Sequence, residues 1–312
     1  MTEVPQLSSK DPASGRTYLR GVVTLALFSM PPIATICEEL KSALDRYVGF
    51  IPASELRWES IGASSEEWKP FNESSIQRCK NQLKAAAASK RSLTSFELAG
   101  GHVGGDAPDY RFFVIGEPVE TEFPAQRTLL QLTFPMSCLD VAEIEGLVSF
   151  ARAIAATVPH VYGYLSPSLQ WAEIGQSHAI LESRAIVARY PGIEVQMNET
   201  GRTWLGTRTR GARWITFLGA ELSATLGSVV AIIRNSPAGV VAEALGTGTL
   251  VRAGLTPELG DRSKQHRTPL LNAVAKLLEP ITAFEEVVLL GSLAKWDKDY
   301  LRKWERRFLD QG

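Results

Sequence analysis

The chain has 312 residues, 45% of them hydrophobic and 21% charged, with a formal net charge of −1 at pH 7. Such a chain is long enough to bury a core without disulfides or metals, and it has no global electrostatic attraction to nucleic acid or anionic membranes. No run of 18 apolar residues occurs, so no membrane-spanning helix is expected.

The N-terminal residues 1–16 are polar and predict a disordered arm without a secretory signal. Three cysteines, Cys37, Cys79 and Cys138, lie far apart and lack CxxC spacing. They are typical of small buried side chains in a reducing compartment. These features predict a cytoplasmic protein.

The first half of the chain alternates apolar strands with amphipathic helices. β-Branched residues over 18–28 predict a buried strand, and Pro31 and Pro32 begin a helix over about 31–48. Further strands are expected at 56–60, 92–98, 111–116 and 128–134, and further helices at 73–90 and about 135–155.

The second half has similar elements. Strands are expected at 161–165 and 214–218, with a hairpin of 240–245 and 249–253 that turns at residues 246–248. Helices are expected at 180–190, 221–226, 269–278 and about 295–309.

These elements predict an α+β fold of mixed or antiparallel sheets packed with helices. Residues 17–290 are expected to form one domain, and residues 291–312 a C-terminal amphipathic helix. Three segments repeat a strand, a tight corner and a helix. The echo fits two similar halves, about 17–125 and 126–290, or the general appearance of α+β proteins.

Few side chains suggest catalysis or metal binding. The histidines His102, His160, His178 and His266 lack metal-ligand spacing, so neither a metal nor a cofactor is expected. Ser292 and Lys295 match the S-x-x-K pattern of serine acyl enzymes, but the companion motifs are missing. A helix-capping serine beside a solvated lysine explains the same residues.

Glycine-rich segments do not complete a phosphate-binding motif. Residues 246–248 lack the third glycine of a dinucleotide fingerprint, and residues 100–105 are not followed by a helix. The second segment is typical of a mobile loop.

Two groups of charged residues are candidates for contact with a partner. The basic run Arg202, Arg208, Arg210 and Arg213 is expected to be a solvated strand or hairpin face, or to contact phosphate or an acidic partner. The C-terminal helix, with Trp296, Tyr300, Trp304 and Phe308 every four residues, is either docked on the body or a partner-binding arm.

The acidic group combines two loops. Asp106 and Asp109 lie on the glycine-rich loop 99–109, and Glu117, Glu120 and Glu122 follow the next strand. These carboxylates are either simply solvated or a decoy surface for a nuclease, whose substrate channel must be basic.

A series of short motifs resembles one known family. Leu-Thr-Phe-Pro stands at 132–135, Arg-Tyr-Pro-Gly at 189–192 and Trp-Ile-Thr-Phe-Leu-Gly at 214–219, and the series closes at 254–261. In this order, over about residues 18–285, the chain resembles the TsiV-like type VI secretion immunity family. The segment after Leu290 departs from the family pattern.

The resemblance implies a cytoplasmic antitoxin that binds and neutralises a cognate toxin of the same bacterium, such as a restriction-endonuclease-like nuclease. It transfers no catalytic residues. The recurrent residues are expected to be structural: Tyr190, Pro191, Gly192, Trp214, Gly219, Pro257, Gly260 and Asp261.

The leading hypothesis is therefore an immunity protein that occludes the toxin's active site or substrate channel through Asp106, Asp109, Glu117, Glu120 and Glu122. Two alternatives remain from the sequence. One is a hydrolase or acyl-transfer enzyme using Ser292 and Lys295 or a histidine, and the other is a scaffolding module.

Overall fold

A single large sheet forms the centre of the computed structural model, which describes residue 5 and residues 7–62, 67–88, 93–116, 128–172, 176–195, 206–284 and 296–310. Within these residues, its order is β11-β12-β10-β8-β2-β7-β6-β5-β3-β4, with β1 paired to β2 and β9 to β8. All pairs are antiparallel except β8 with β9. The strands are β1 (Ser8–Lys10), β2 (Thr17–Ser29), β3 (Trp58–Ile61), β4 (Lys69–Pro70), β5 (Thr94–Ala99), β6 (Arg111–Gly116), β7 (Thr128–Pro135), β8 (Tyr162–Trp171), β9 (Glu194–Val195), β10 (Ile215–Leu218), β11 (Val240–Leu245) and β12 (Gly248–Ala253).

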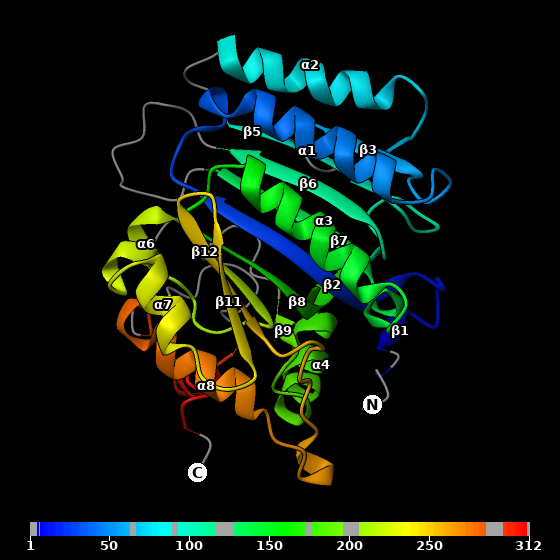
Figure 1. Ribbon diagram of the computed structural model, residues 1–312. Helices are drawn as coiled ribbons and strands as arrows, with labels where there is room; N and C mark the ends of the chain where they lie inside the picture. The colour runs from blue at the N-terminus through cyan, green and yellow to red at the C-terminus, as the bar shows by residue number, and fades with distance from the viewer. Residues whose placement is uncertain are drawn as a thin grey trace.

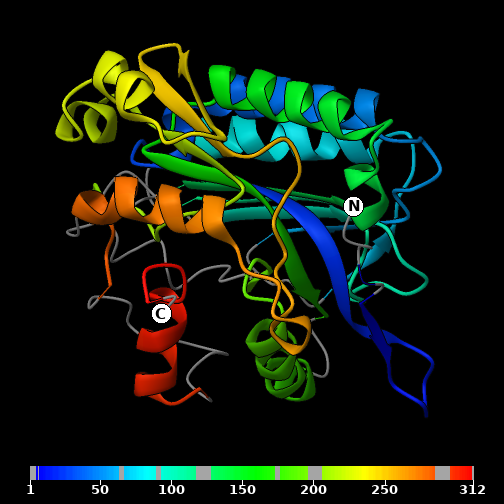
Figure 2. The ribbon, with the colours of Figure 1, turned by 60° about the horizontal axis from the view of Figure 1, so that its bottom comes forward.

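Helices cover both faces of this sheet. Figures 1 and 2 show α1, α2 and α3 side by side on one face, with α4, α8 and α9 on the other side of the strands. The helices are α1 (Cys37–Phe50), α2 (Ser75–Ala88), α3 (Ile144–Thr157), α4 (Gln176–Arg189), α6 (Ala220–Thr225), α7 (Val229–Asn235), α8 (Pro269–Leu278) and α9 (Lys298–Glu305), and the 3-10 turns are η1 (Ile33–Thr35), η2 (Met136–Leu139), η3 (Arg262–Lys264) and η4 (Glu279–Ile281). The predicted α+β class is confirmed.

The central strand β2 divides the core into two layers. Side chains alternate between the faces of a strand, so Val23, Leu25 and Leu27 pack with α1 and α3. On the opposite face, Ala26 and Phe28 join the apolar cluster that includes α8. Burial on both faces explains why this strand is apolar at every position but Thr24 between Val22 and Phe28.

The sequence echo has a structural counterpart in two neighbouring units. In one, β2, η1 and α1 follow each other, and in the other β7, η2 and α3 do. Their strands pair antiparallel in the sheet. The division into halves and the domain limits stay predictions.

The N-terminal segment differs from its predicted structure. Residues 7–16 do not form a disordered arm, because β1 pairs with β2 in the register Ser8↔Arg20. β7 pairs with β2 only from Val22 onward, so β1 occupies the edge that β7 leaves open along the first residues of β2. A short polar strand has no apolar alternation, so the sequence alone does not reveal it.

The motifs at 189–192 and 254–261 contact each other directly. Gly192 N–H donates to the carbonyl of Leu259 at 2.8 Å. Arg189 forms two hydrogen bonds with the Asp261 carboxylate, at 3.1 and 3.0 Å. A Cβ atom on Gly192 would lie 1.9 Å from the Glu258 carbonyl oxygen. The two motifs therefore meet in one close backbone contact.

We expect Gly192→Ala to lower the free energy of unfolding by about 2 kcal/mol or more, because the new methyl group meets backbone that cannot move aside easily. Gly146→Ala in α3 is the matched control, since its Cβ would have no neighbour within 4 Å. There alanine should raise stability by about 0.5–1 kcal/mol. Urea unfolding measures both, and equal effects of the two substitutions would contradict the close contact.

Candidate interaction surface

The loop between β5 and β6 is held against the start of β2 by its aspartates. Asp106 is buried, and its carboxylate accepts from Arg16 Nε at 3.0 Å and from Val103 N–H at 3.3 Å. Asp109 is half-buried and forms an ion pair with Arg20. Asp106 therefore anchors the loop, whereas Asp109 remains accessible at its edge.

An acidic rim surrounds Asp109. Burial raises the pKa of the Asp109 carboxyl above its usual range, with Glu55 adding to the effect and Arg20 opposing it. Burial also raises the pKa of the Cys138 thiol to about 12, and Glu143, Asp140 and Asp109 contribute in that order. We call Glu55, Asp109, Asp140 and Glu143 the acidic rim.

Two residues of the acidic rim, Asp109 and Asp140, line a groove of about 400 Å³. Its lining includes Arg20, Asp109, Pro135, Met136 and Asp140. Asp140 and Glu143 are exposed, and Val141 between them is 65% exposed. An apolar side chain among accessible carboxylates is a suitable contact point for a protein partner.

Glu117, Glu120 and Glu122 lie outside the described residues. In the chain they follow Gly116, the last residue of β6, whereas Asp109 precedes the first residue of β6. The two ends of a six-residue strand are roughly 17 Å apart. The described part of the chain thus does not show the five predicted carboxylates together.

The described side chains do not assemble a catalytic constellation. Ser292 and Lys295 lie outside the described residues. All three cysteines are free and buried, and burial raises the pKa of each thiol. Burial lowers the pKa of His160. The described residues also contain no group of three or more His, Cys, Asp or Glu placed to hold a metal ion.

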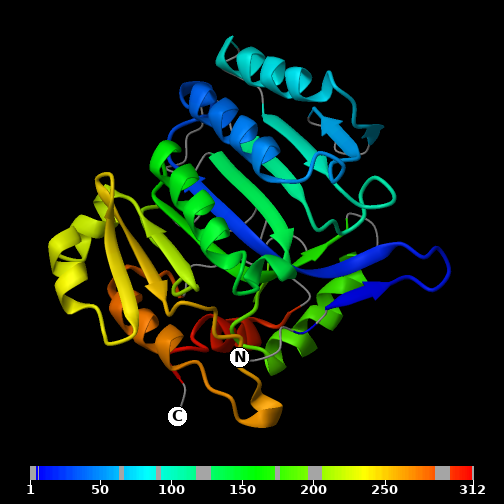
Figure 3. The same ribbon diagram turned by 45° about the vertical axis from the view of Figure 1, so that its right-hand side comes forward.

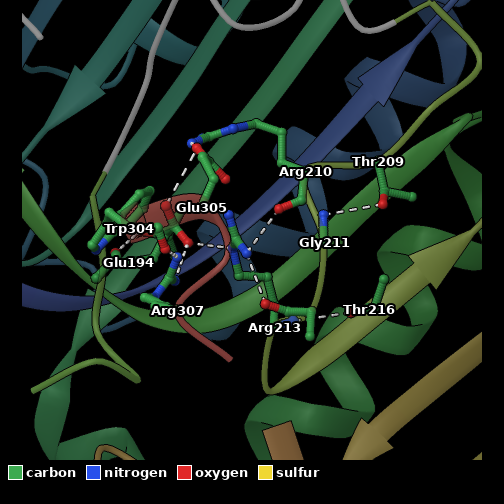
Figure 4. A network of polar contacts seen from close by, with 12 residues as sticks. Glu194, Thr209, Arg210, Gly211, Arg213, Thr216, Trp304, Glu305 and Arg307 are labelled. Atoms are coloured by element: carbon green, nitrogen blue, oxygen red, sulfur yellow. Dashed lines mark hydrogen bonds and ion pairs between the residues drawn. The ribbon is translucent and has the colours of Figure 1, made fainter. Parts of the chain in front are cut away.

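The prediction that the basic run lies on a solvated face is wrong for Arg210 and Arg213. Arg210 and Arg213 are each only 2% exposed, and Arg202 lies outside the described residues. Both buried arginines belong to an ionic cluster between β9, the segment before β10 and the end of α9 (Figure 4). Sequence reasoning missed this cluster because its acids lie far away in the chain.

The ionic cluster contains Glu194, Arg210, Arg213, Glu305 and Arg307. Glu194 is fully buried and pairs with Arg213, and also with Arg307 at 3.2 Å. Arg210 Nη2 lies 2.5 Å from Glu305 Oε1. Three guanidinium groups face two carboxylates, so the cluster has one excess positive charge. Burial, with Arg213 and Arg210 adding to it against Glu194 and Glu305, lowers the pKa of Arg307 to about 10.

The aromatic side chains near the C-terminus pack against the rest of the fold. Trp296 and Trp304 are buried with Leu301 against α4. Trp296 Nε1 donates to the Ile180 carbonyl at 3.1 Å, and Arg307 Nε donates to the Pro191 carbonyl at 2.7 Å. α9 is thus a docked helix, and the alternative of a free partner-binding arm is not supported.

We expect Glu194→Ala to lower the free energy of unfolding by about 3–5 kcal/mol, because it leaves buried guanidinium groups without their shared carboxylate. Glu145→Ala is the control. Its side chain is 64% exposed although it pairs with Arg252 at 2.6 Å, so its loss should cost about 1 kcal/mol or less. Denaturant unfolding compares the two, and an equal loss would show that the buried cluster does not anchor the fold.

A pH-dependent contribution is expected from Asp261. The Arg189 and Ser263 side chains lower the pKa of its carboxyl, so the ionised form stabilises the fold above the unfolded value of about 3.9. This contribution is lost as the pH falls below that value. The stability difference between wild type and Asp261→Asn should therefore shrink between pH 5 and pH 2. A constant difference in unfolding free energy over that range would contradict the Arg189 pairing.

Comparisons with known proteins agree with this architecture. The sequence model of the TsiV family, described as type VI immunity for VRR-NUC, matches residues 39–308. The match includes α9, although the resemblance is expected to stop near residue 285. No curated protein matches the chain.

A solved structure shares the fold. The Pseudomonas aeruginosa T6SS protein PA0821 superposes with a TM-score of 0.77 at 17% identity, over 97% of this chain and 87% of that chain. At this identity the similarity shows the fold alone. Because the family model covers most of the sequence, the chain belongs to the TsiV family of type VI immunity proteins.

Proposed function

We propose that this protein neutralises a cognate nuclease toxin by binding it and occluding its active site or substrate channel. Membership of an immunity family favours this function over the enzyme and scaffold hypotheses. The family description names VRR-NUC as the target of immunity, which supports a nuclease as the toxin. Neutralisation needs only tight binding, so the protein itself requires no catalytic group.

The observation behind the binding surface is the acidic rim around the groove. A nuclease channel must be positively charged to hold the nucleic acid backbone. The exposed carboxylates of Asp140 and Glu143 would be attracted to such a channel and would accelerate association, whereas Asp109 is partly neutralised by its pairing with Arg20. Val141 would add an apolar contact within an interface of about 1,200–2,000 Å².

The remaining predicted carboxylates have different roles in this proposal. Asp106 would act indirectly, by holding the loop that presents Asp109. Glu117, Glu120 and Glu122 belong to the proposed partner-binding surface on sequence grounds. A cytoplasmic location is also part of the proposal, and three free, buried cysteines are consistent with a reducing compartment. In the described part of the chain, no helix combines the length and apolarity needed to cross a membrane.

We expect the double charge reversal Asp140→Lys/Glu143→Lys to slow association with the cognate toxin at least tenfold at about 50 mM salt, because it removes long-range attraction. Surface plasmon resonance measures the rate constants, and growth during toxin co-expression reports protection.

Glu221→Lys/Glu279→Lys is the matched control, because both glutamates are exposed on other elements and the change in net charge is the same. Association rates that are equal for the two double variants would rule out the acidic rim. Glu120→Lys tests the sequence-based part of the surface separately, and unchanged neutralisation would remove Glu120 from it.

A further inference from the structure

A second charged surface lies on the opposite side of α4 from the N-terminal hairpin. The loop 262–267 contains Arg262, Lys264, His266 and Arg267, all exposed. Among the described residues, no carboxylate lies within ion-pair distance of Arg262, Lys264 or Arg267. We call residues 262–267 the cationic loop.

The fold holds the cationic loop in a defined conformation. Asp261 and His266 exchange two backbone hydrogen bonds, of 3.1 and 3.0 Å. The Asp261 carboxylate accepts from Ser263 N–H at 3.0 Å and is itself bound by Arg189. Gln265 adopts the left-handed conformation, with a φ of 58°, to complete the turn. Such preorganisation lowers the entropy lost when a partner binds.

The cationic loop borders a cavity of about 590 Å³. Its lining includes Arg262, His266 and Arg267 from the loop and Arg307 from the ionic cluster. That cluster has three guanidinium groups and two carboxylates, so its excess positive charge lies directly behind the loop. Asp310 also lines the cavity, but Arg306 already pairs with it at 3.3 Å.

The cationic loop lies at the same end of the molecule as the N-terminal hairpin. α4 contacts both β2 and η3, and Figures 2 and 3 show the β1–β2 hairpin and the loop around η3 on either side of α4. The groove of the acidic rim borders this hairpin through Leu7 and Arg20. The N-terminal hairpin and α4 thus connect the acidic rim to the cationic loop, and a partner that contacts both regions would have to span these two elements.

We propose that the cationic loop is a second part of the toxin-binding surface and binds a carboxylate-rich region of the toxin. This inference rests on the proposed function for the identity of the partner. Unpaired guanidinium and ammonium groups beside an excess buried positive charge attract anions, and planar guanidinium groups bind carboxylates in a bidentate manner. A nucleic acid partner is disfavoured, because the whole chain has a net charge of −1.

The test is the triple reversal Arg262→Glu/Lys264→Glu/Arg267→Glu. The control, Lys84→Glu/Arg234→Glu/Lys276→Glu, reverses three exposed cations on α2, α7 and α8 and changes the net charge equally. Circular dichroism and thermal unfolding verify the fold. If the triple reversal does not fold, a neutral triple variant with Gln at positions 262, 264 and 267 is used in its place.

We expect the triple reversal to reduce the association rate constant for the toxin at least tenfold at about 50 mM salt, with the control unchanged. The difference should shrink at about 500 mM salt, because screening shortens the range of the attraction. If the wild type binds the toxin and the triple reversal associates with it as fast as the control does, this inference is overturned. The proposed function would remain intact.

Two other outcomes would also decide what the cationic loop binds. Wild-type protein that does not bind the toxin would overturn the proposed function itself, and this inference with it. Binding of a labelled DNA duplex that the triple reversal abolishes, without an effect on toxin binding, would assign the loop to nucleic acid instead.

Discussion

A buried carboxylate shared by three arginines holds together segments that the sheet alone does not connect. Glu194 on β9 is fully buried and pairs with Arg213 and Arg307. These partners precede β10 and follow α9, so one side chain joins the sheet, the segment before β10 and the C-terminal end. Removing Glu194 would leave buried guanidinium groups without their shared carboxylate in a low-dielectric interior, which is far more costly than losing an exposed pair. The cluster reaches α9 through Glu305 and the Pro191 carbonyl through Arg307, so it ties both segments to β9.

The strands were the most predictable part of the fold, because burial leaves a direct mark on their sequence. Between Val22 and Phe28, β2 is apolar at every position but Thr24, and the β11–β12 hairpin has the expected turn at Gly246 and Gly248. Elements that depend on distant partners were missed. β1 is short and polar, and α7 contains β-branched residues typical of a strand, although Ser228 caps it as a helix by accepting from Ala231 N–H.

The candidate site was only partly predictable for the same reason. The loop with Asp106 and Asp109 was expected, but their ion pairs with Arg16 and Arg20 bridge about 90 positions. Arg210 and Glu305 are 95 positions apart, so nothing in the local sequence distinguishes a buried arginine from a solvated one. Asp140 and Glu143 join Asp109 only because β7 ends beside the start of β6 in the sheet.

The acidic rim and the cationic loop carry opposite charges at one end of the molecule. Carboxylates lie near the groove on one side of the N-terminal hairpin, and unpaired cations lie beyond α4. In the proposed complex, a toxin whose basic substrate channel adjoins acidic groups would present the complementary pattern, so these opposite charges would favour one orientation of binding over others. The exposed apolar residues Val230, Ile233 and Val241 lie elsewhere, on α7 and β11, and are an alternative contact surface.

Hydrogen–deuterium exchange of the protein alone and in complex with its cognate toxin would locate the binding surface. If the acidic rim and the cationic loop form this surface, exchange in the bound state is slower at residues 104–110, 136–143 and 262–267, with little change in α6, α7 and β11. Protection confined to α7 and β11, with unchanged exchange in the acidic rim and the cationic loop, would show that the toxin binds elsewhere.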